Sequence, residues 1–437
     1  MRTTILAGAT ALSLLLPATR SHVAAAGIPG YAIRGAKIVT VSGAVMDSGT
    51  VVIRGGRIDR VAPGTAVVEG VEDIDGHGLV VYPGLVDLAS TAGLDVPASE
   101  PPKEPESREV SERWRRQQLI RAQQATADFL RPDAPELAKL VGAGITNALL
   151  VPRGEGISGQ SAFIDVAAAE IDPQYGRVAL DPRAPMVLKT PVALHVSFPG
   201  RGFFGAYPAS LMGGIAFTRQ AFLDADRYRL AAAMPGATGD RPAYDPALAA
   251  MAAATGMKLP VAFEATSPRE IRRVLAFAKE FSLSPIIVGA GGAGAVTGDL
   301  TAAGARVIVS LNFPERSKAL APDADEPLDD IEARANARKV AGALAAAGVP
   351  FGFGSAGLKD AKDFLPNVRT AVAQGLAADA AVRALTLDAA TIAGVGRQLG
   401  AIEAGRIANL VVTDGDLLAQ KTKVKYVFVE GRRIPLP

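Results

Sequence analysis

Residues 260–288 read PVAFEATSPREIRRVLAFAKEFSLSPIIV and place a helical pattern between two short apolar runs. In the helical part, five apolar residues recur at the spacing of one helix face: Ile271, Val274, Leu275, Ala278 and Phe281. The charged residues of this part fall on the other faces. A strand, an amphipathic helix and a second strand with short connections predict a unit of a parallel sheet.

The same alternation continues through the middle of the chain. Further strands are expected at 145–151, 306–311 and 349–353, and further helices at 136–141, 293–303 and 329–347. Since residues 83–399 are long enough for eight such units with insertions, we predict an α/β fold with a TIM-like (β/α)8 barrel there.

Residues 97–131 match this pattern poorly. They begin with a Pro- and Glu-rich stretch and continue as a charged helical pattern near 110–129 with few apolar residues. We interpret them as a lid or surface insertion, and the Arg113–Arg116 cluster as a solvated face.

The two ends of the chain are β-rich and similar in character. Short strands are expected at 36–41, 49–53 and 58–61, and again at 407–412 and 424–430. Because neither end has enough strands to bury both faces of a sheet alone, we predict one small composite β-sandwich domain. Its two parts would be residues 27–82 and 400–437, on either side of the barrel.

Residue counts restrict the chemistry of the chain. It has 437 residues, three histidines and no cysteine, which excludes disulfides, thiol catalysis and thiolate metal sites. Basic residues number 46 and acidic residues 44, and Arg2 and Arg20 lie in the first 26 residues. The remainder is neutral, so we expect no nucleic-acid partner.

Residues 1–26 have the pattern of a secretory signal peptide. Arg2 precedes an apolar run from Ile5 to Leu16, and Ala24–Ala26 offer small residues for cleavage before Gly27. The run is shorter than the roughly 20 residues of a spanning helix, and we expect no membrane span after cleavage. We predict export across the inner membrane, to the periplasm. An uncleaved N-terminal anchor is the alternative.

Two signatures and three shorter segments carry a family resemblance. The signatures are IDGHGLVVYPGLVD at 74–87 and, near the other end, LTLDAA at 385–390 followed by LGAIEAGRIANLVV at 399–412. The shorter segments are GAGITN at 142–147, GQS at 159–161 and MGGIA at 212–216. Together they resemble the amidohydrolase superfamily, in particular its imidazolonepropionase-like secreted members, over nearly the whole mature chain.

The resemblance implies a hydrolase of C–N bonds in small amides, or in some members of dipeptides, with one or two divalent metals such as zinc at the C-terminal mouth of the barrel. Such a metal acts as a Lewis acid and lowers the pKa of a bound water.

The resemblance also implies where the metal ligands would lie. Six positions correspond, in chain order, to a His-x-His pair, a bridging lysine, two histidines and an aspartate that is also the general base: Ala89, Thr91, Asp165, Glu264, Gly289 and Ala356. None of the six carries the family's residue type, and alanine cannot coordinate a metal. A binuclear centre of this family uses four histidines, whereas cleavage would remove His22 and leave His77 and His195. We therefore expect no metal and no other cofactor.

A different site remains open. Asp165, Glu264 and His195 are the candidates for catalytic roles in a rearranged centre. Asp87 together with Asp165 and Glu264 would supply carboxylates for Ca²⁺ or Mg²⁺, or an acid/base pair. Alternatively, Asp87 caps its strand end and Asp165 faces an arginine such as Arg153.

Two other features have ordinary explanations. His77 lies between glycines in a turn, where the family has no ligand. The Gly-rich run at 290–294 lacks the Lys-Ser/Thr of a P-loop and indicates a tight strand-to-helix turn. We also expect larger side chains or water to fill the space that metals would have occupied.

Three functions follow as hypotheses. The first, which we favour, is a non-catalytic binding or partner subunit, as a homo-oligomer or with an active homologue. The second is a hydrolase with a site rearranged around Asp165, Glu264 and His195. The third is a protein that binds a sugar or other small molecule at the barrel mouth.

Overall fold

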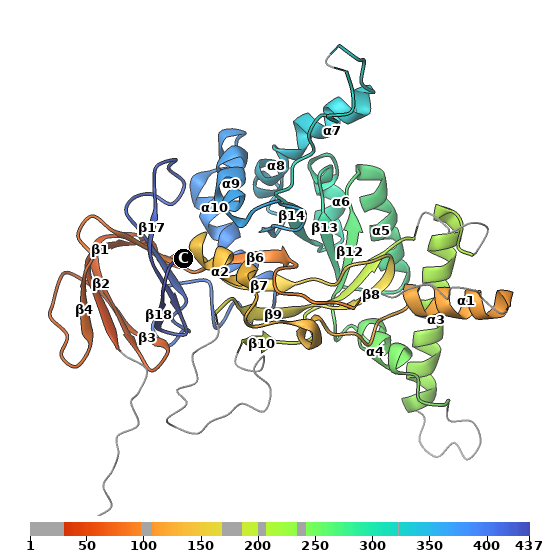
Figure 1. The fold of residues 1–437 in the computed structure, drawn as a ribbon, viewed down its shortest axis with the longest axis horizontal. Coiled ribbons are helices and arrows are strands. Elements are labelled where there is room, and N and C mark those ends of the chain that lie inside the picture. The colour runs from red at the N-terminus through yellow and green to blue at the C-terminus, as the bar shows by residue number, and fades with distance from the viewer. Residues whose placement is uncertain (1–29, 98–106, 168–185, 200–206, 234–241, 322) are drawn as a thin grey trace, which may run out of the picture.

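The structure is a computed structural model that describes residues 30–97, 107–167, 186–199, 207–233, 242–321 and 323–437. The predicted signal peptide lies outside the described residues. Strands from the two ends of the chain form a sheet at one side of the molecule, and the helix-covered sheets occupy the rest (Figure 1).

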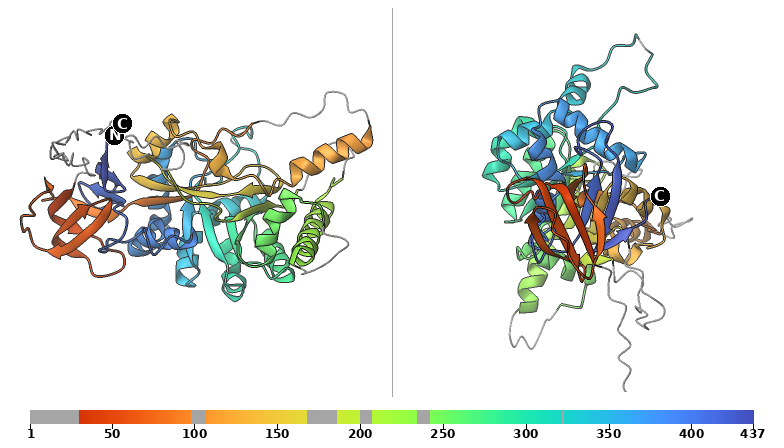
Figure 2. Two further views of the ribbon diagram at one scale, coloured as in Figure 1. Left: turned by 90° about the horizontal axis from the view of Figure 1, so that it is seen from below. Right: turned by 90° about the vertical axis from the view of Figure 1, so that its left-hand side faces the viewer.

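Both chain ends contribute to one eight-stranded sheet, in the order β18-β17-β16-β5-β1-β2-β3, with β4 paired to β1. Its strands are β1 (Tyr31–Ile38), β2 (Met46–Arg54), β3 (Arg57–Pro63), β4 (Glu72–Asp75), β5 (Val80–Pro83), β16 (Leu410–Thr413), β17 (Val424–Val429) and β18 (Arg432–Ile434). Figure 2 shows the early and late strands side by side. The predicted sharing of one sheet is confirmed, although the eight strands form one continuous sheet and not two hydrogen-bonded layers. The domain boundaries remain predictions.

The middle of the chain forms two further sheets. The order of the first is β10-β9-β7-β6, and the order of the second is β15-β14-β13-β12-β11-β8. Their strands are β6 (Leu85–Ser90), β7 (Ile145–Leu150), β8 (Gly156–Gln160), β9 (Ala162–Asp165), β10 (Val187–Lys189), β11 (Leu194–Ser197), β12 (Val261–Ala265), β13 (Pro285–Gly289), β14 (Arg306–Ser310) and β15 (Phe351–Gly354).

Strands β11 to β15 are parallel to one another, as are β6 and β7. The α/β class is therefore confirmed. No ladder among the described strands closes the two sheets into a barrel, so the closed eightfold barrel remains a prediction. At the seam between β6 and β15, the Ser355 amide donates to the side chain of Asp87 and not to a strand carbonyl.

Helices cover the outer face of these sheets (Figure 1). The α-helices are α1 (Arg108–Leu119), α2 (Pro135–Gly142), α3 (Leu211–Ala233), α4 (Pro246–Thr255), α5 (Pro268–Glu280), α6 (Thr297–Ala302), α7 (Leu328–Ala337), α8 (Val340–Ala346), α9 (Phe364–Ala373), α10 (Ala378–Leu385) and α11 (Leu387–Ile392). Short 3-10 turns are η1 (Thr126–Phe129), η3 (Ala293–Val296) and η4 (Ala361–Asp363). No described helix has the length and apolar character to cross a bilayer.

Three of the predicted helices are shorter or interrupted. The helix expected at 110–129 ends at Leu119, and Ile120 then bridges to Ile157 of β8. The helix expected at 293–303 is a 3-10 turn followed by α6. The helix expected at 329–347 breaks between α7 and α8, because α7 is mostly exposed whereas α8 buries Val340 and Leu344.

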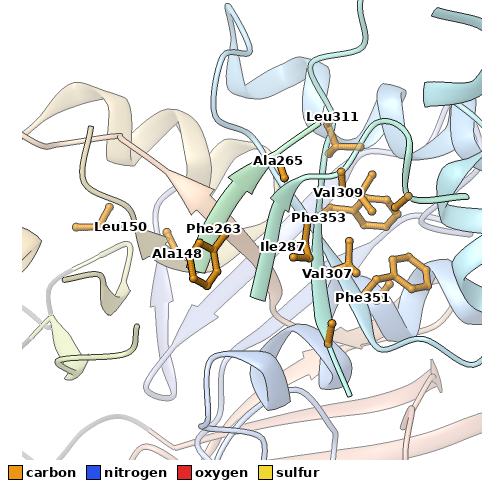
Figure 3. Packing of buried hydrophobic residues seen from close by; sticks show 14 of the residues in the cluster. Ala148, Leu150, Phe263, Ala265, Ile287, Val307, Val309, Leu311, Phe351 and Phe353 are labelled. Carbon is orange, nitrogen blue, oxygen red and sulfur yellow. The ribbon is translucent and has the colours of Figure 1, made fainter. Parts of the chain in front are cut away.

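Successive residues of the parallel strands point to opposite faces of the sheet, so alternate residues belong to two different apolar cores. One set packs against the helices, and Figure 3 shows Phe263, Ile287, Val309 and Phe353 from four neighbouring strands in this cluster. The other set includes Ala262, Ile286 and Ile308 and packs between the strands and α11. The C-terminal ends of the parallel strands are therefore held on a rigid base, and side chains at these ends form the candidate site.

Candidate functional site

Five of the six positions aligned with metal ligands lie at or just beyond the C-terminal ends of parallel strands. Ala89 and Thr91 are at the end of β6, Glu264 is near the end of β12, Gly289 ends β13, and Ala356 follows β15. This is the edge at which α/β folds of this type place their active sites.

The residues at this edge do not suit a divalent metal. Among the described residues, no group of three or more His, Asp or Glu side chains is close enough to hold a metal ion. The Ala89 methyl group is buried against β15, where a Cβ added to Gly354 would come within 2.6 Å of it. Thr91 accepts a hydrogen bond from the Arg153 guanidinium, so a cation already lies at this ligand position. The divalent metals that the resemblance implies therefore do not fit these residues.

Asp87 joins the first and last strands at this edge. Its side chain is fully buried and accepts hydrogen bonds from the amides of Ala89 (3.1 Å) and Ser355 (2.9 Å). The Ser355 hydroxyl also donates to it, at 2.5 Å. Burial raises the pKa of Asp87, and the bonds from Ser355, Ala89 and Ser90 counteract this. The expected cap at the strand end is therefore also a clamp between β6 and β15.

A cavity of about 430 Å³ opens beside this clamp. Hydroxyl groups of Ser90, Thr91 and Ser355 line its inner end, next to Arg153. Its outer end has charged side chains from the loop after β6, from α2 and from the loop before η4: Asp95, Arg131, Glu136, Lys139, Lys359 and Asp360. The lining of this cavity does not include Ala89, Gly289 or Ala356.

Asp165 lies at the opposite end of the strands. It ends β9, which runs antiparallel to β7 and places Asp165 across from Asn147, close to the start of β7. The Nδ2 atoms of Asn147 and Asn409 donate to its Oδ1, at 2.8 and 2.6 Å. Burial and the charge of Glu430 raise the pKa of Asp165 to about 8 against the effect of these two bonds. Arg153 does not face it, and the expected Arg153 partner is wrong because Arg153 contacts Thr91.

His195 is buried among apolar groups between these two ends. It pairs with Ala262 in β12 and Gly159 in β8, and its Nε2 has no hydrogen-bond partner. Burial lowers the pKa of His195 to about 3, so the ring is neutral at physiological pH.

The three candidates for a rearranged centre are therefore not brought together. The carboxyl of Asp165 is bound by two asparagines, the ring nitrogen Nε2 of His195 has no hydrogen-bond partner, and Glu264 is exposed near the end of β12. Partial burial raises the pKa of Glu264 although its side chain reaches the surface. No hydrogen bond or ion pair between any two of these residues is found in the described chain.

Two minor sequence interpretations can be placed in the structure. His77 is exposed in its turn, where its ring Nδ1 lies 2.5 Å from Asp75. The Gly-rich run follows β13 into η3, and the Ala293 amide donates to the Ala290 carbonyl at 2.9 Å. Both are local turn interactions, as expected.

Three residues of these hydrogen-bond networks could not be identified from the sequence: Ser355, Asn147 and Asn409. Asn147 lies in the segment GAGITN and Asn409 in the signature at 399–412. No local pattern indicates that these asparagines share a partner, because they are 262 residues apart.

Comparisons with known proteins agree on the fold. A family model described as "Amidohydrolase family" matches residues 232–434. No curated protein sequence matches the chain. An amidohydrolase from Thermotoga maritima has a similar solved structure, with a TM-score of 0.77, 18% identity, and coverage of 93% of this chain and 100% of that one.

Two further solved structures have the same general fold. A Xaa-Pro dipeptidase with bound methionine has a TM-score of 0.55 and 16% identity and covers 93% of this chain and 99% of its own. A putative prolidase from Bifidobacterium longum has a TM-score of 0.56 and 18% identity and covers 93% and 95%. The family match over residues 232–434 and the fold shared over most of the chain confirm the predicted resemblance to the amidohydrolase superfamily.

Proposed function

We propose that the chain is an exported protein of amidohydrolase fold that has no metal centre and acts as a non-catalytic binding or partner subunit. The carrying observation is the contact between Arg153 and Thr91, one of the positions aligned with metal ligands. Arg153 is exposed, and its guanidinium is always charged, so a divalent cation at this position would be repelled by it.

The neighbouring ligand positions support the same proposal. Ala89 and Ala356 offer no donor atoms, and Gly289 has no side chain. Glu264 is then a single carboxylate without a second ligand, which is a weak site for any divalent ion. Of the hypotheses with catalysis, the arrangement around Asp165, Glu264 and His195 has no supporting contact.

Metal content tests this proposal directly. The mature protein is purified in chelator-free buffer with added Zn²⁺, Mn²⁺ or Mg²⁺, and bound metal is measured by mass spectrometry. We expect less than about a tenth of an equivalent, because no set of ligands converges. One or two equivalents, together with turnover of Xaa-Pro dipeptides, would refute it. This choice of substrate follows from the names of the two neighbours, the Xaa-Pro dipeptidase and the putative prolidase.

Export and partnership are separate parts of the proposal. N-terminal sequencing of protein expressed from the full-length sequence is expected to begin at Gly27, and an intact Met1 would indicate the uncleaved anchor. Light scattering of the purified protein distinguishes a monomer from a homo-oligomer. A monomer that co-purifies with an active amidohydrolase would support the partner role.

A further inference from the structure

The Arg153 guanidinium lines the cavity beside Thr91 and is exposed there. The guanidinium donates to the Thr91 hydroxyl through Nη2. The backbone of the same residue is held by Arg121, whose Nη2 donates to the Arg153 carbonyl at 2.9 Å. Arg153 is therefore anchored at both ends.

Arg153 is also not neutralised. Among the described residues, no carboxylate forms an ion pair with it, and its one side-chain partner is a neutral hydroxyl. A guanidinium has five N–H donors in a planar fork, so several remain available to a ligand. The Thr91 oxygen accepts the bond from Arg153, which leaves the hydroxyl proton of Thr91 to donate into the cavity as well.

Two of the three acidic side chains that line the cavity have cations of their own. Asp95 is 4.0 Å from Arg131, and Asp360 is 3.3 Å from Lys362. Glu136 is exposed on α2. Lys359 adds a further exposed ammonium group to the lining. The cavity lining as a whole is electropositive, because it has four cationic side chains and three carboxylates, the cations being Arg131, Lys139, Arg153 and Lys359.

We propose that this cavity binds a small molecule through an oxyanion, a carboxylate or a phosphate group, with Arg153 and Thr91 as the donors. The volume of about 430 Å³ is within the range of small-molecule sites. A planar guanidinium recognises either oxyanion by two parallel hydrogen bonds. The proposal rests on the proposed function in one respect, that no metal occupies the mouth beside Thr91.

The test uses the mature full chain with succinate and inorganic phosphate as probes, in separate titrations by calorimetry at constant ionic strength maintained with NaCl. We expect saturable one-to-one binding of at least one probe, and the tighter probe identifies the type of oxyanion. Arg153→Gln is expected to weaken binding about 10- to 100-fold, because it removes charge-assisted hydrogen bonds. Arg153→Lys, which keeps the charge but not the fork, is expected to fall between wild type and Arg153→Gln.

Arg397→Gln is the matched control, since it removes the same charge from an exposed site outside the cavity and should leave the affinity unchanged. If Arg153→Gln does not fold, Thr91→Val removes the hydroxyl donor and is expected to weaken binding several-fold. Equal affinity of wild type and Arg153→Gln, or no saturable binding of either probe, would overturn the proposal. A metal-free protein that binds neither probe would overturn the oxyanion site and leave the proposed function standing. A protein that contains a stoichiometric metal would refute both the oxyanion site and the proposed function.

Discussion

Asp165→Asn is the substitution with the clearest expected effect on stability. The Asp165 carboxyl is buried, and burial together with the charge of Glu430 raises its pKa to about 8. In the unfolded chain the same carboxyl has an ordinary pKa of about 3.9. At neutral pH the folded protein therefore holds a proton here that the unfolded chain has released.

Asparagine matches the protonated form of this side chain. Its Oδ1 keeps the bonds from the amide groups of Asn147 and Asn409, and its own amide group takes the place of Oδ2, which has no hydrogen-bond partner. The asparagine side chain at position 165 cannot ionise. Because a raised pKa in the folded state costs stability as pH rises, wild type loses about 1.4 kcal/mol per pH unit from about pH 4 to about pH 8 relative to the variant. Between pH 5 and pH 7 the difference amounts to about 2.7 kcal/mol, and above pH 8 it is constant.

Urea unfolding of both proteins at pH 5, 6, 7 and 8.5 measures this difference. Subtracting the wild-type free energy of unfolding from that of the variant at each pH cancels the groups that the two proteins share. Asp59→Asn, at an exposed position in β3, is the control and should follow wild type at every pH. A difference that does not change between pH 5 and pH 7 would show that Asp165 is ionised in the folded protein, and the argument from burial would be wrong.

Three other substitutions test the packing around the site. His195→Leu should gain about 2.3 kcal/mol relative to wild type between pH 6.5 and pH 4.5, because burial lowers the pKa of His195 to about 3 and the unfolded chain takes up a proton first; urea unfolding at both values checks this. Ser355→Ala should cost about 1.5–3 kcal/mol in the same assay at pH 7, since it removes a hydroxyl donor from the buried Asp87 carboxyl, and no change would contradict the clamp. Gly354→Ala should cost about 1–3 kcal/mol through the close approach to Ala89, and Ala89→Gly in the same chain should restore most of the loss if that contact is the cause.

The parallel core of the fold could be predicted because its signals are local. The α5 helix (Pro268–Glu280) contains four of the five residues of the expected apolar face, and Ser267 and Glu270 form a capping box at its start. The α3 helix, with 23 residues, was not predicted. Its start contains Gly213 and Gly214, which disfavour a helix, and several of its apolar residues are exposed, Met212 among them at 80%. The α3 helix therefore lacks the single apolar face by which a helix is recognised in a sequence.

In the candidate site too, only the positions with a local signal in the sequence could be predicted. Positions at strand ends were placed correctly because each follows its own strand directly. Asp165 was placed at the mouth, which is wrong, because the chain turns back after β8 and β9 runs antiparallel to β7. The contacts of Arg153 with Thr91 and of Asp165 with Asn409 join segments 62 and 244 residues apart, and no local pattern specifies them.

Two buried carboxyl groups hold the two ends of the parallel strands, and neither requires a metal. Asp87 accepts the amide and hydroxyl of Ser355 and so fixes β6 against β15 directly beside Thr91. Asp165 accepts the amide of Asn409, whose own Oδ1 accepts the Glu430 amide of the composite sheet, so the sheet and the strand layer share one network. In a metalloenzyme the ligands and the metal would add to the rigidity of the mouth. Here the rigidity comes from hydrogen bonds to Asp87, and a mouth held in this way can keep Arg153 and Thr91 in place for a ligand without a metal between them.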